Sequence, residues 1–470
     1  MRPVKPHSAA LDMTAGSVSG KLMKLAWPVM AAQLLQTLYN LADAFWLGKL
    51  GRQALVAPTI SMHVVFVVMA VAMGLGSAGT TLVSQYRGAG RMDRAVKAGG
   101  QTFILLAVVS VTLGILGFLF TPWVLRLLNT PPDALIETRI YMRWIFAGIP
   151  LMFPFFVYQG ISTGLGDTMG PLQVSLVTVI LNIVLDPLLI FGLGPIPALG
   201  VTGAVAATVF CHGLASMIGA VRLFKGRNGF RLSLPALRPD SKTISKILSI
   251  GLPMSLGQAG TSLGFTVMIG IVNSFGSAVT AAFGVGNRII HLALVPAMAL
   301  SQANAAAVGQ SLGAGMTYRA ERSTRSALLI IAVILLPVTI PMFFYGASIS
   351  RIFVDDPQVM EIGRTMFRIT TPSVFAFGFV TVLFGAFQGS GHTFPVMVLN
   401  VARLWLLRIP LAYMLSLHAG LGANGLWWAM FISNTATVVA GGFWFSTGSW
   451  KRKSREILGG PALVSEGVLE

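Results

Sequence analysis

Four polar residues share one face of a strongly apolar segment near the N-terminus. The four are Gln33, Gln36, Asn40 and Asp43, at spacings of i, i+3, i+7 and i+10. In a helix these spacings bring all four side chains to one face. A carboxylate in a lipid-embedded helix costs about 2.5–3.5 kcal/mol on insertion scales, so it normally faces a bundle interior or a water-filled cavity. We therefore expect a functional role for Asp43.

A second polar face lies in the apolar run 168–194, and a single threonine follows in the next run. The residues are Ser175, Thr178, Asn182 and Asp186, with Thr208 after them. Two carboxylates that face one cavity would couple, which favours proton exchange. The neighbouring amide and hydroxyl oxygens could instead ligate a hard monovalent cation. We predict that a site for H⁺ or Na⁺ is formed by Asp43, Asn182, Asp186 and Thr208.

The composition is that of an all-α integral membrane protein. Of 470 residues, 54% are hydrophobic and 10% are charged, where a soluble protein carries about 25% charged residues. The net charge of +18 does not indicate nucleic acid, because the basic residues stand in short loops between apolar runs. The single cysteine, Cys211, excludes an intramolecular disulfide. No cleavable signal is evident, since the first twenty residues are polar.

Twelve apolar runs are long enough to cross a membrane, which takes about 20 residues each. They are 22–47, 54–84, 98–125, 138–164, 168–194, 200–222, 246–273, 279–310, 323–348, 360–388, 393–416 and 421–447. We predict a segment 1–21, an N-lobe 22–222, a basic linker 223–245, a C-lobe 246–447 and a tail 448–470. Basic residues gather in the N-terminal segment, the linker, two even-to-odd loops and the tail, so positive-inside places both termini in the cytoplasm.

The two halves repeat each other. Gln85 and Gln310 stand 225 positions apart, and the same shift pairs Pro28 with Pro253. The segments Q-Y-R-G-A-G-R-M-D-R-A and Q-S-L-G-A-G-M-T-Y-R-A also match at this shift. Six spans per half make the halves parallel repeats about an axis along the membrane normal. We expect two six-helix bundles with a central cleft.

The repeat also serves as an internal control, because the scaffold needs the same residues in both halves. The second half has apolar residues where the first has its polar set: Met268 for Asp43, Trp405 for Asn182, Ile409 for Asp186 and Met430 for Thr208. A set present in one half favours function over a structural hydrogen-bonded cluster.

Three sequence blocks resemble the MATE family, the multidrug and toxic compound extrusion transporters. They are L-Y-N-L-A-D-A-F-W-L-G-K-L-G, G-L-G-S-A-G-T-T-L-V-S-Q-Y-R-G-A-G-R-M-D-R-A and L-N-I-V-L-D-P-L-L-I-F-G-L-G. In the second half G-S-G-H-T and R-L-W-L-L-R-I-P-L agree, so the resemblance covers residues 20–450. It implies two six-helix lobes around a V-shaped cavity, and cation-coupled antiport of amphipathic, often cationic compounds by alternating access.

Within the family the chain resembles the DinF-type branch, whose cation site lies in the N-lobe. The branch's site residues match Asp43, Asn182 and Asp186, and Thr208 matches through its G-x-x-G-A-x-x-A-T context. The NorM-type branch has acidic residues in the C-lobe, and this sequence lacks them there. The branch also implies that Pro28 lets the first helix bend, although Pro253 at the paired position equally suggests a shared packing kink.

Other residues carry weaker signals. Candidate substrate contacts are Gln36, Tyr39, Asn40 and Gln159. Arg288, Arg403 and Arg408 could line the cavity or snorkel to an interface. The G-L-G-S-A-G run at 74–79 fits a dinucleotide pattern, but it follows no strand and favours close helix packing.

We therefore expect a multi-pass transporter of the cell membrane with small amphipathic substrates, for which a monomer suffices. No cofactor and no metal other than a coupling Na⁺ are expected. A lipid flippase of the same superfamily is the alternative, although it would favour a basic cavity. An integral-membrane enzyme is disfavoured, because no nucleophile or acid/base pair stands near an interface loop. Parallel repeats and the one-sided ion set also disfavour a receptor or channel.

Overall fold

The computed structural model describes residues 10–128, 130–192, 197–226 and 229–459. The first half contains α1 (Val18–Leu50), α2 (Arg52–Gly88), α3 (Met92–Leu127), α4 (Leu135–Gly164), α5 (Met169–Phe191) and α6 (Val201–Lys225). The second half contains α7 (Ser241–Asn273), α8 (Ser277–Gly313), α9 (Thr317–Phe344), α10 (Gly346–Arg351), α11 (Pro357–Ser390), α12 (Phe394–Val401), α13 (Ile409–Tyr413), α14 (Ala423–Ser446) and α15 (Ser449–Leu458). Two π-helical stretches, Ala402–Arg408 and Met414–His418, join α12 and α13 into one rod.

Each predicted span coincides with a long helix, or with the α12–α13 rod for 393–416. Within the described residues, ten helical segments are long and apolar enough to cross a membrane. α1 and α14 are not among the ten. In α1 the polar residues Gln33, Gln36, Asn40 and Asp43 interrupt the apolar sequence. The all-helical membrane fold is thus confirmed, whereas twelve crossings remain a prediction.

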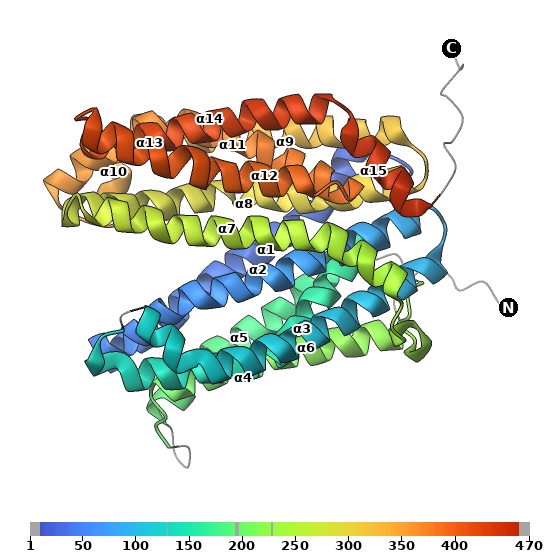
Figure 1. Cartoon of the computed structure of the whole chain (residues 1–470), viewed down its shortest axis with the longest axis horizontal. Helices are drawn as coiled ribbons and strands as arrows, with labels where there is room; N and C mark the ends of the chain where they lie inside the picture. Colours follow the sequence, from blue (N-terminus) through green and yellow to red (C-terminus); the bar gives the residue numbers. More distant parts are fainter. Residues whose placement is uncertain (1–9, 129, 193–196, 227–228, 460–470) are drawn as a thin grey trace.

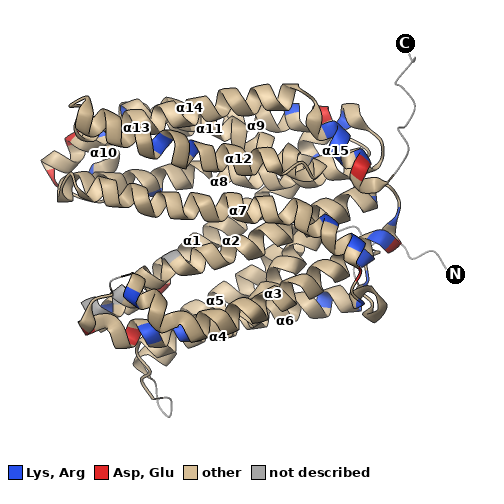
Figure 2. Cartoon of the chain, viewed as in Figure 1, with Lys and Arg blue, Asp and Glu red and all other residues tan. Residues whose placement is uncertain are grey.

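The helices form two bundles, α1–α6 and α7–α14 (Figure 1). The bundles converge at the end where α15 lies and diverge toward the other end (Figure 1). α2 packs against both α7 and α8, and α1 also packs against α8. Figure 2 shows basic residues dense at the convergent end, around α15 and the turn between α2 and α3, with fewer at the opposite end.

Two glutamines join the lobes through a reciprocal pair of hydrogen bonds. Gln85 of α2 donates through Nε2 to the Gly389 carbonyl at 2.9 Å, and Gln310 of α8 donates to the Gly164 carbonyl at 3.0 Å. Both side chains are buried. Because the two bonds are related by the 225-residue repeat, they lie about the pseudo-twofold axis of the molecule.

Glycines allow α2 and α8 to approach each other beside these glutamines. A Cβ atom at Gly88 would lie 2.0 Å from the Gln310 carbonyl oxygen, and one at Gly313 would lie 2.0 Å from that of Gln85. Gly74, in the predicted packing motif, is as close: its Cβ would lie 2.1 Å from Ser255 Oγ of α7. The close-packing interpretation of 74–79 is therefore correct at Gly74.

Paired glycines also form the turns at this end. Gly90, after α2, has φ +69°, and Gly315, after α8, has φ +76°. This left-handed conformation strains other residues, which explains why both halves have glycine at the same position of their turns.

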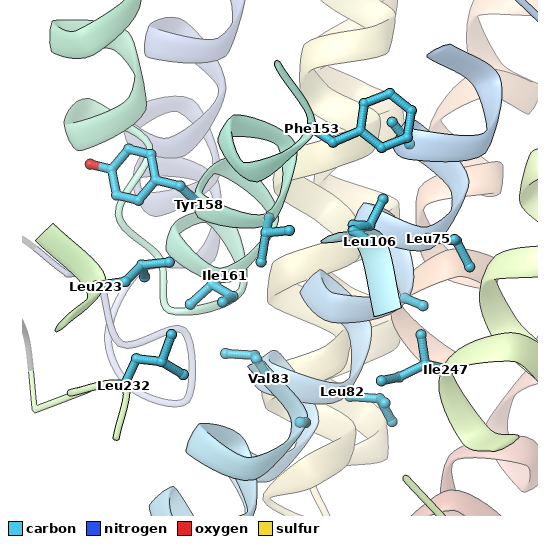
Figure 3. Close-up of a cluster of buried hydrophobic side chains, with 14 of the residues drawn as sticks. Leu75, Leu82, Val83, Leu106, Phe153, Tyr158, Ile161, Leu223, Leu232 and Ile247 are labelled. Atoms are coloured by element: carbon cyan, nitrogen blue, oxygen red, sulfur yellow. The ribbon is translucent and has the colours of Figure 1, made fainter. Parts of the chain in front are cut away.

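The N-lobe core is a layer of apolar side chains between its helices (Figure 3). It reaches into the linker through Phe230 and Leu232, and into the C-lobe through Ile247 of α7. The labelled members are Leu75, Leu82, Val83, Leu106, Phe153, Tyr158, Ile161, Leu223, Leu232 and Ile247 (Figure 3). The linker is therefore packed onto the bundle, and Gln101 fixes it further by donating to the Ala236 and Arg238 carbonyls.

Helix α15 lies in the predicted tail and was not among the expected elements. It buries Trp450 and Ile457 and leaves its basic residues at the surface. Carbonyl groups at the C-terminal end of α15 accept hydrogen bonds from both lobes. Arg91 of the N-lobe donates to the Leu458 carbonyl at 3.2 Å, and Lys246 of the C-lobe donates to the Ile457 carbonyl at 2.6 Å.

Replacing Gly88 by valine should destabilise the protein by about 1–3 kcal/mol, since the added carbons overlap the α8 backbone. Thermal unfolding in detergent, followed by tryptophan fluorescence, should show a lowered Tm. Gly270→Ala is the matched control, because no atom lies within 4 Å of its Cβ position. Equal melting temperatures for Gly88→Val and wild type would contradict the close approach.

Candidate functional site

Three N-lobe helices bring the predicted polar residues together. Asp43 comes from α1, Asn182 and Asp186 from α5, and Thr208 from α6. α4 adds Tyr141. Asn182, Asp186 and Thr208 are buried, with 1%, 0% and 7% of their surfaces exposed, and Asp43 is partly buried.

We call Asp43, Asn182, Asp186, Thr208 and Tyr141 the N-lobe cluster. Direct hydrogen bonds connect some of its members to each other and to neighbouring residues. Asn182 donates through Nδ2 to Asp186 Oδ1 at 3.2 Å, as the i, i+4 spacing on α5 predicts. The hydroxyls of Tyr39 and Thr208 lie 2.8 Å apart and join α1 to α6. His212, one turn after Thr208, places Nδ1 3.0 Å from the Thr208 carbonyl oxygen.

Three oxygens of the N-lobe cluster are buried and have no hydrogen-bond partner among the described residues. They are Asp43 Oδ1, Asn182 Oδ1 and Asp186 Oδ2. The two carboxyl groups also act on each other electrostatically. A buried unpaired acceptor costs about 1–3 kcal/mol, so this set is suited to gain a proton or an oxygen-coordinated cation.

The remaining predicted residues lie in different places. Gln36 and Asn40 are exposed on α1, with Gln36 Nε2 3.4 Å from Asn40 Oδ1. Gln159 is partly buried on α4, about 27 Å along an ideal helix from Tyr141, so it is not part of the cluster. Pro28 is buried in α1, which continues through it.

Pro28 has the same surroundings as its counterpart in the C-lobe. Thr168 donates through Oγ1 to the Leu25 carbonyl at 3.0 Å, and Thr393 donates to the Ile250 carbonyl at 2.7 Å, three residues before Pro253. The 225-residue repeat relates the two bonds, which supports a structural role common to both prolines.

Comparison with known proteins identifies the family. The MatE family model matches residues 28–188 and 253–414. The chain belongs to the MatE family. The probable multidrug resistance protein YpnP of Bacillus subtilis is 28% identical over 94% of this chain and 98% of its own length. The FAD transporter of Shewanella oneidensis is 29% identical over 93% of this chain and 96% of its own.

Solved structures share the fold of this chain. A crystal structure of MATE in complex with MaL6 is 25% identical, with a TM-score of 0.86 over 96% of this chain and 99% of the other. An outward-facing conformation of a multidrug resistance MATE family transporter is 24% identical, with a TM-score of 0.87 over 97% and 99%. The predicted resemblance to the MATE family is confirmed, whereas the DinF-type branch stays a prediction. Membership makes this chain a multi-pass membrane transporter rather than an enzyme.

In this MatE chain the C-lobe does not repeat the acidic cluster. Met268 and Met430, the counterparts of Asp43 and Thr208, are buried in an apolar C-lobe core with 1% and 4% exposure. Trp405, the counterpart of Asn182, instead donates through Nε1 to the Gly260 carbonyl at 2.9 Å. The asymmetry between halves expected from the sequence is therefore present in space.

Three residues in or beside the N-lobe cluster were not predicted as site residues. Tyr141 is buried and interacts electrostatically with both aspartates. Cys211 lies beside Asn182 and Asp186, and the His212 ring is 5.9 Å from that of Tyr39. Cys211 and His212 follow Thr208 by three and four residues, so their spacing could have indicated that they lie on the same face of α6. Nothing in the sequence of α4 distinguishes Tyr141 in this way.

Replacing Asp186 by asparagine should stabilise the protein by roughly 1–3 kcal/mol, because it removes a buried carboxylate that faces another. The gain should grow as pH rises, since both wild-type carboxyls are then ionised, and shrink at low pH, where protonation removes the repulsion. Thermal unfolding at several pH values measures it. Asp93→Asn, an exposed acid outside the cluster, is the control. A lower Tm for Asp186→Asn at high pH would show that the carboxylate is held by favourable contacts.

Proposed function

We propose that this protein is a cation-coupled antiporter that exports amphipathic, often cationic compounds by alternating access. The observation that supports this most is the pair of buried carboxylates, Asp43 and Asp186, with unpaired oxygens in one lobe alone. Such a site gains stability from each proton or Na⁺ that it binds. It can therefore couple the entry of an ion to a change of conformation.

The coupling ion binds at Asp43, Asn182, Asp186 and Thr208 in this proposal, as in the DinF-type branch. α1 supplies Asp43, whereas α5 and α6 supply the other three residues. Neutralising the carboxylates therefore changes how α1 packs against α5 and α6. The hydrogen bond between Tyr39 and Thr208 also connects α1 to α6. Pro28, which removes one backbone donor from α1, is the point where that helix bends.

The substrate surface is the exposed face of α1. Gln36 and Asn40 provide hydrogen-bonding groups there, and the exposed Leu34, Leu38 and Leu41 lie on the same helix. This mixture suits amphipathic molecules. Gln159, far along α4, would meet a substrate only at another stage of transport. The acidic cluster does not favour the flippase alternative, and a monomer contains every residue that the mechanism uses.

In this proposal the convergent end of the lobes lies in the cytoplasm, which the basic residues near both termini support. In that orientation the divergent end faces outside, and α1 presents its C-terminal half toward that side. The reciprocal bonds of Gln85 and Gln310 then hold the cytoplasmic end closed.

The coupling proposal predicts that Asp43→Asn abolishes gradient-driven efflux. Efflux of a fluorescent cationic dye from proteoliposomes is measured under an imposed proton gradient and, separately, a sodium gradient. Wild type should respond to one of the two, which names the ion, and the amide should not respond because it can neither take up a proton nor offer a charge. Asp93→Asn should behave as wild type.

Efflux by Asp43→Asn at the wild-type rate would move the coupling site away from α1. If neither gradient changes the rate of efflux by the wild type, cation coupling is rejected. A labelled lipid-linked substrate would then be tested.

The orientation predicts the labelling of single cysteines. In a Cys211→Ser background, Ala419→Cys lies in the exposed turn before α14 and Ser241→Cys at the start of α7. A membrane-impermeant maleimide added to intact cells should label Ala419→Cys, and should label Ser241→Cys only after permeabilisation. The reverse pattern would invert the proposed topology.

A further inference from the structure

Two arginines are buried at mid-height in the C-lobe. Arg403 and Arg408 lie in the π-helical stretch Ala402–Arg408, and 6% and 2% of their surfaces are exposed. Figure 2 shows basic residues interrupting the otherwise uncharged ribbon near α13. A π-helix closes its turn at i→i+5, so residues five apart come to the same side of the rod. Both arginines can therefore face α11 and α14 together.

The two guanidinium groups converge on one amide. Asn434 Oδ1 of α14 accepts from Arg403 Nη1 at 3.3 Å and from Arg408 Nη2 at 2.5 Å. Arg408 Nε also donates to Ser433 Oγ at 2.9 Å. The Phe377 ring of α11 lies 4.4 Å from Arg403 Cζ. Arg403 Nε is buried and has no hydrogen-bond partner among the described residues.

No acidic side chain of the described residues pairs with this cationic pair. The charged group that acts on Arg408 is Arg403 itself. Asp43 and Asp186 belong to the opposite lobe, and neither acts on the arginines. Two like charges buried side by side repel and have lost their hydration, so an anion between them would be strongly favourable.

The repeat places the cationic pair where the other lobe has its acidic cluster. Ser433 and Asn434 are the counterparts of Cys211 and His212. Arg408 directly precedes Ile409, the counterpart of Asp186. The same location in the fold thus carries opposite charge in the two lobes.

We infer that Arg403 and Arg408, with Asn434 between them, form a site for an oxyanion group, a carboxylate or a phosphate. The planar guanidinium fork matches the paired oxygens of both groups, and Arg403 Nε is a free donor for them. The group could arrive as a free anion or as part of a carried molecule. Binding here does not require the proposed coupling in the N-lobe.

Binding is tested on the purified full-length protein in lipid nanodiscs, at constant pH, chloride and sodium. Inorganic phosphate and phenyl phosphate are titrated, with benzyl alcohol as an uncharged aromatic control, and Tm is followed by tryptophan fluorescence. Wild type should show a saturable rise with the phosphates and none with benzyl alcohol. Arg408→Gln and Arg403→Gln should weaken the apparent affinity about tenfold or more.

Arg143→Gln is the matched control, because Arg143 also stacks on an aromatic ring, Phe118, and has a buried unpaired Nε, but lies in the N-lobe. It should bind as wild type does. Asp43→Asn should bind as well, which separates this site from the coupling proposal. If Arg408→Gln does not fold, Arg403→Lys keeps the charge and loses the fork, and should also bind more weakly.

A wild type without a saturable response, or arginine variants that respond as wild type does, would overturn the site. Tighter binding of phenyl phosphate than of phosphate would support the site and identify the anion as part of a carried organic molecule. Tighter binding of phosphate would support a free oxyanion.

Discussion

The cost of a charge without a partner inside a membrane protein is the constraint on which this structure depends. Within the described residues the long helices bury few charges, and each buried charged group therefore needs an explanation in packing or in binding. Asp43 and Asp186 keep buried oxygens unpaired. In the proposed mechanism a bound proton or Na⁺ would stabilise them. We propose that ion binding at these oxygens is linked to how α1 packs on α5 and α6.

The two lobes are joined mainly at one end, which would allow them to move relative to each other in the proposed mechanism. Gln85 and Gln310 exchange equivalent hydrogen bonds there, and glycines next to them bring α2 and α8 into backbone contact. These contacts obey the pseudo-twofold axis, whereas the charged groups do not. The scaffold is symmetric where the lobes contact each other, and asymmetric at the charged groups for which we propose ligands.

The fold could be predicted largely from the sequence, since apolar runs define the helices and the 225-residue repeat defines the two lobes. The repeat also exposed Asn182, Asp186 and Thr208, because their counterparts are apolar. The sequence predicts Tyr39 as a substrate contact, and the structure adds a contact between its hydroxyl and that of Thr208. The contact of Tyr39 with Thr208 depends on how α1 packs against α6, which no sequence pattern within either helix encodes. Helix α15 was missed because two buried side chains, Trp450 and Ile457, anchor an otherwise polar segment.

Arg403 and Arg408 show most clearly where sequence reasoning ends. On an α-helix, residues five apart point to different faces, so the sequence left open whether these side chains line a cavity or extend to an interface. The π-helical stretch changes that register and turns both toward Asn434. A local change in helix type thus decides whether two charges are separate or form one cluster. Since the other lobe has two acids at the corresponding place, our two proposals together assign a cation to one lobe and an anion to the other.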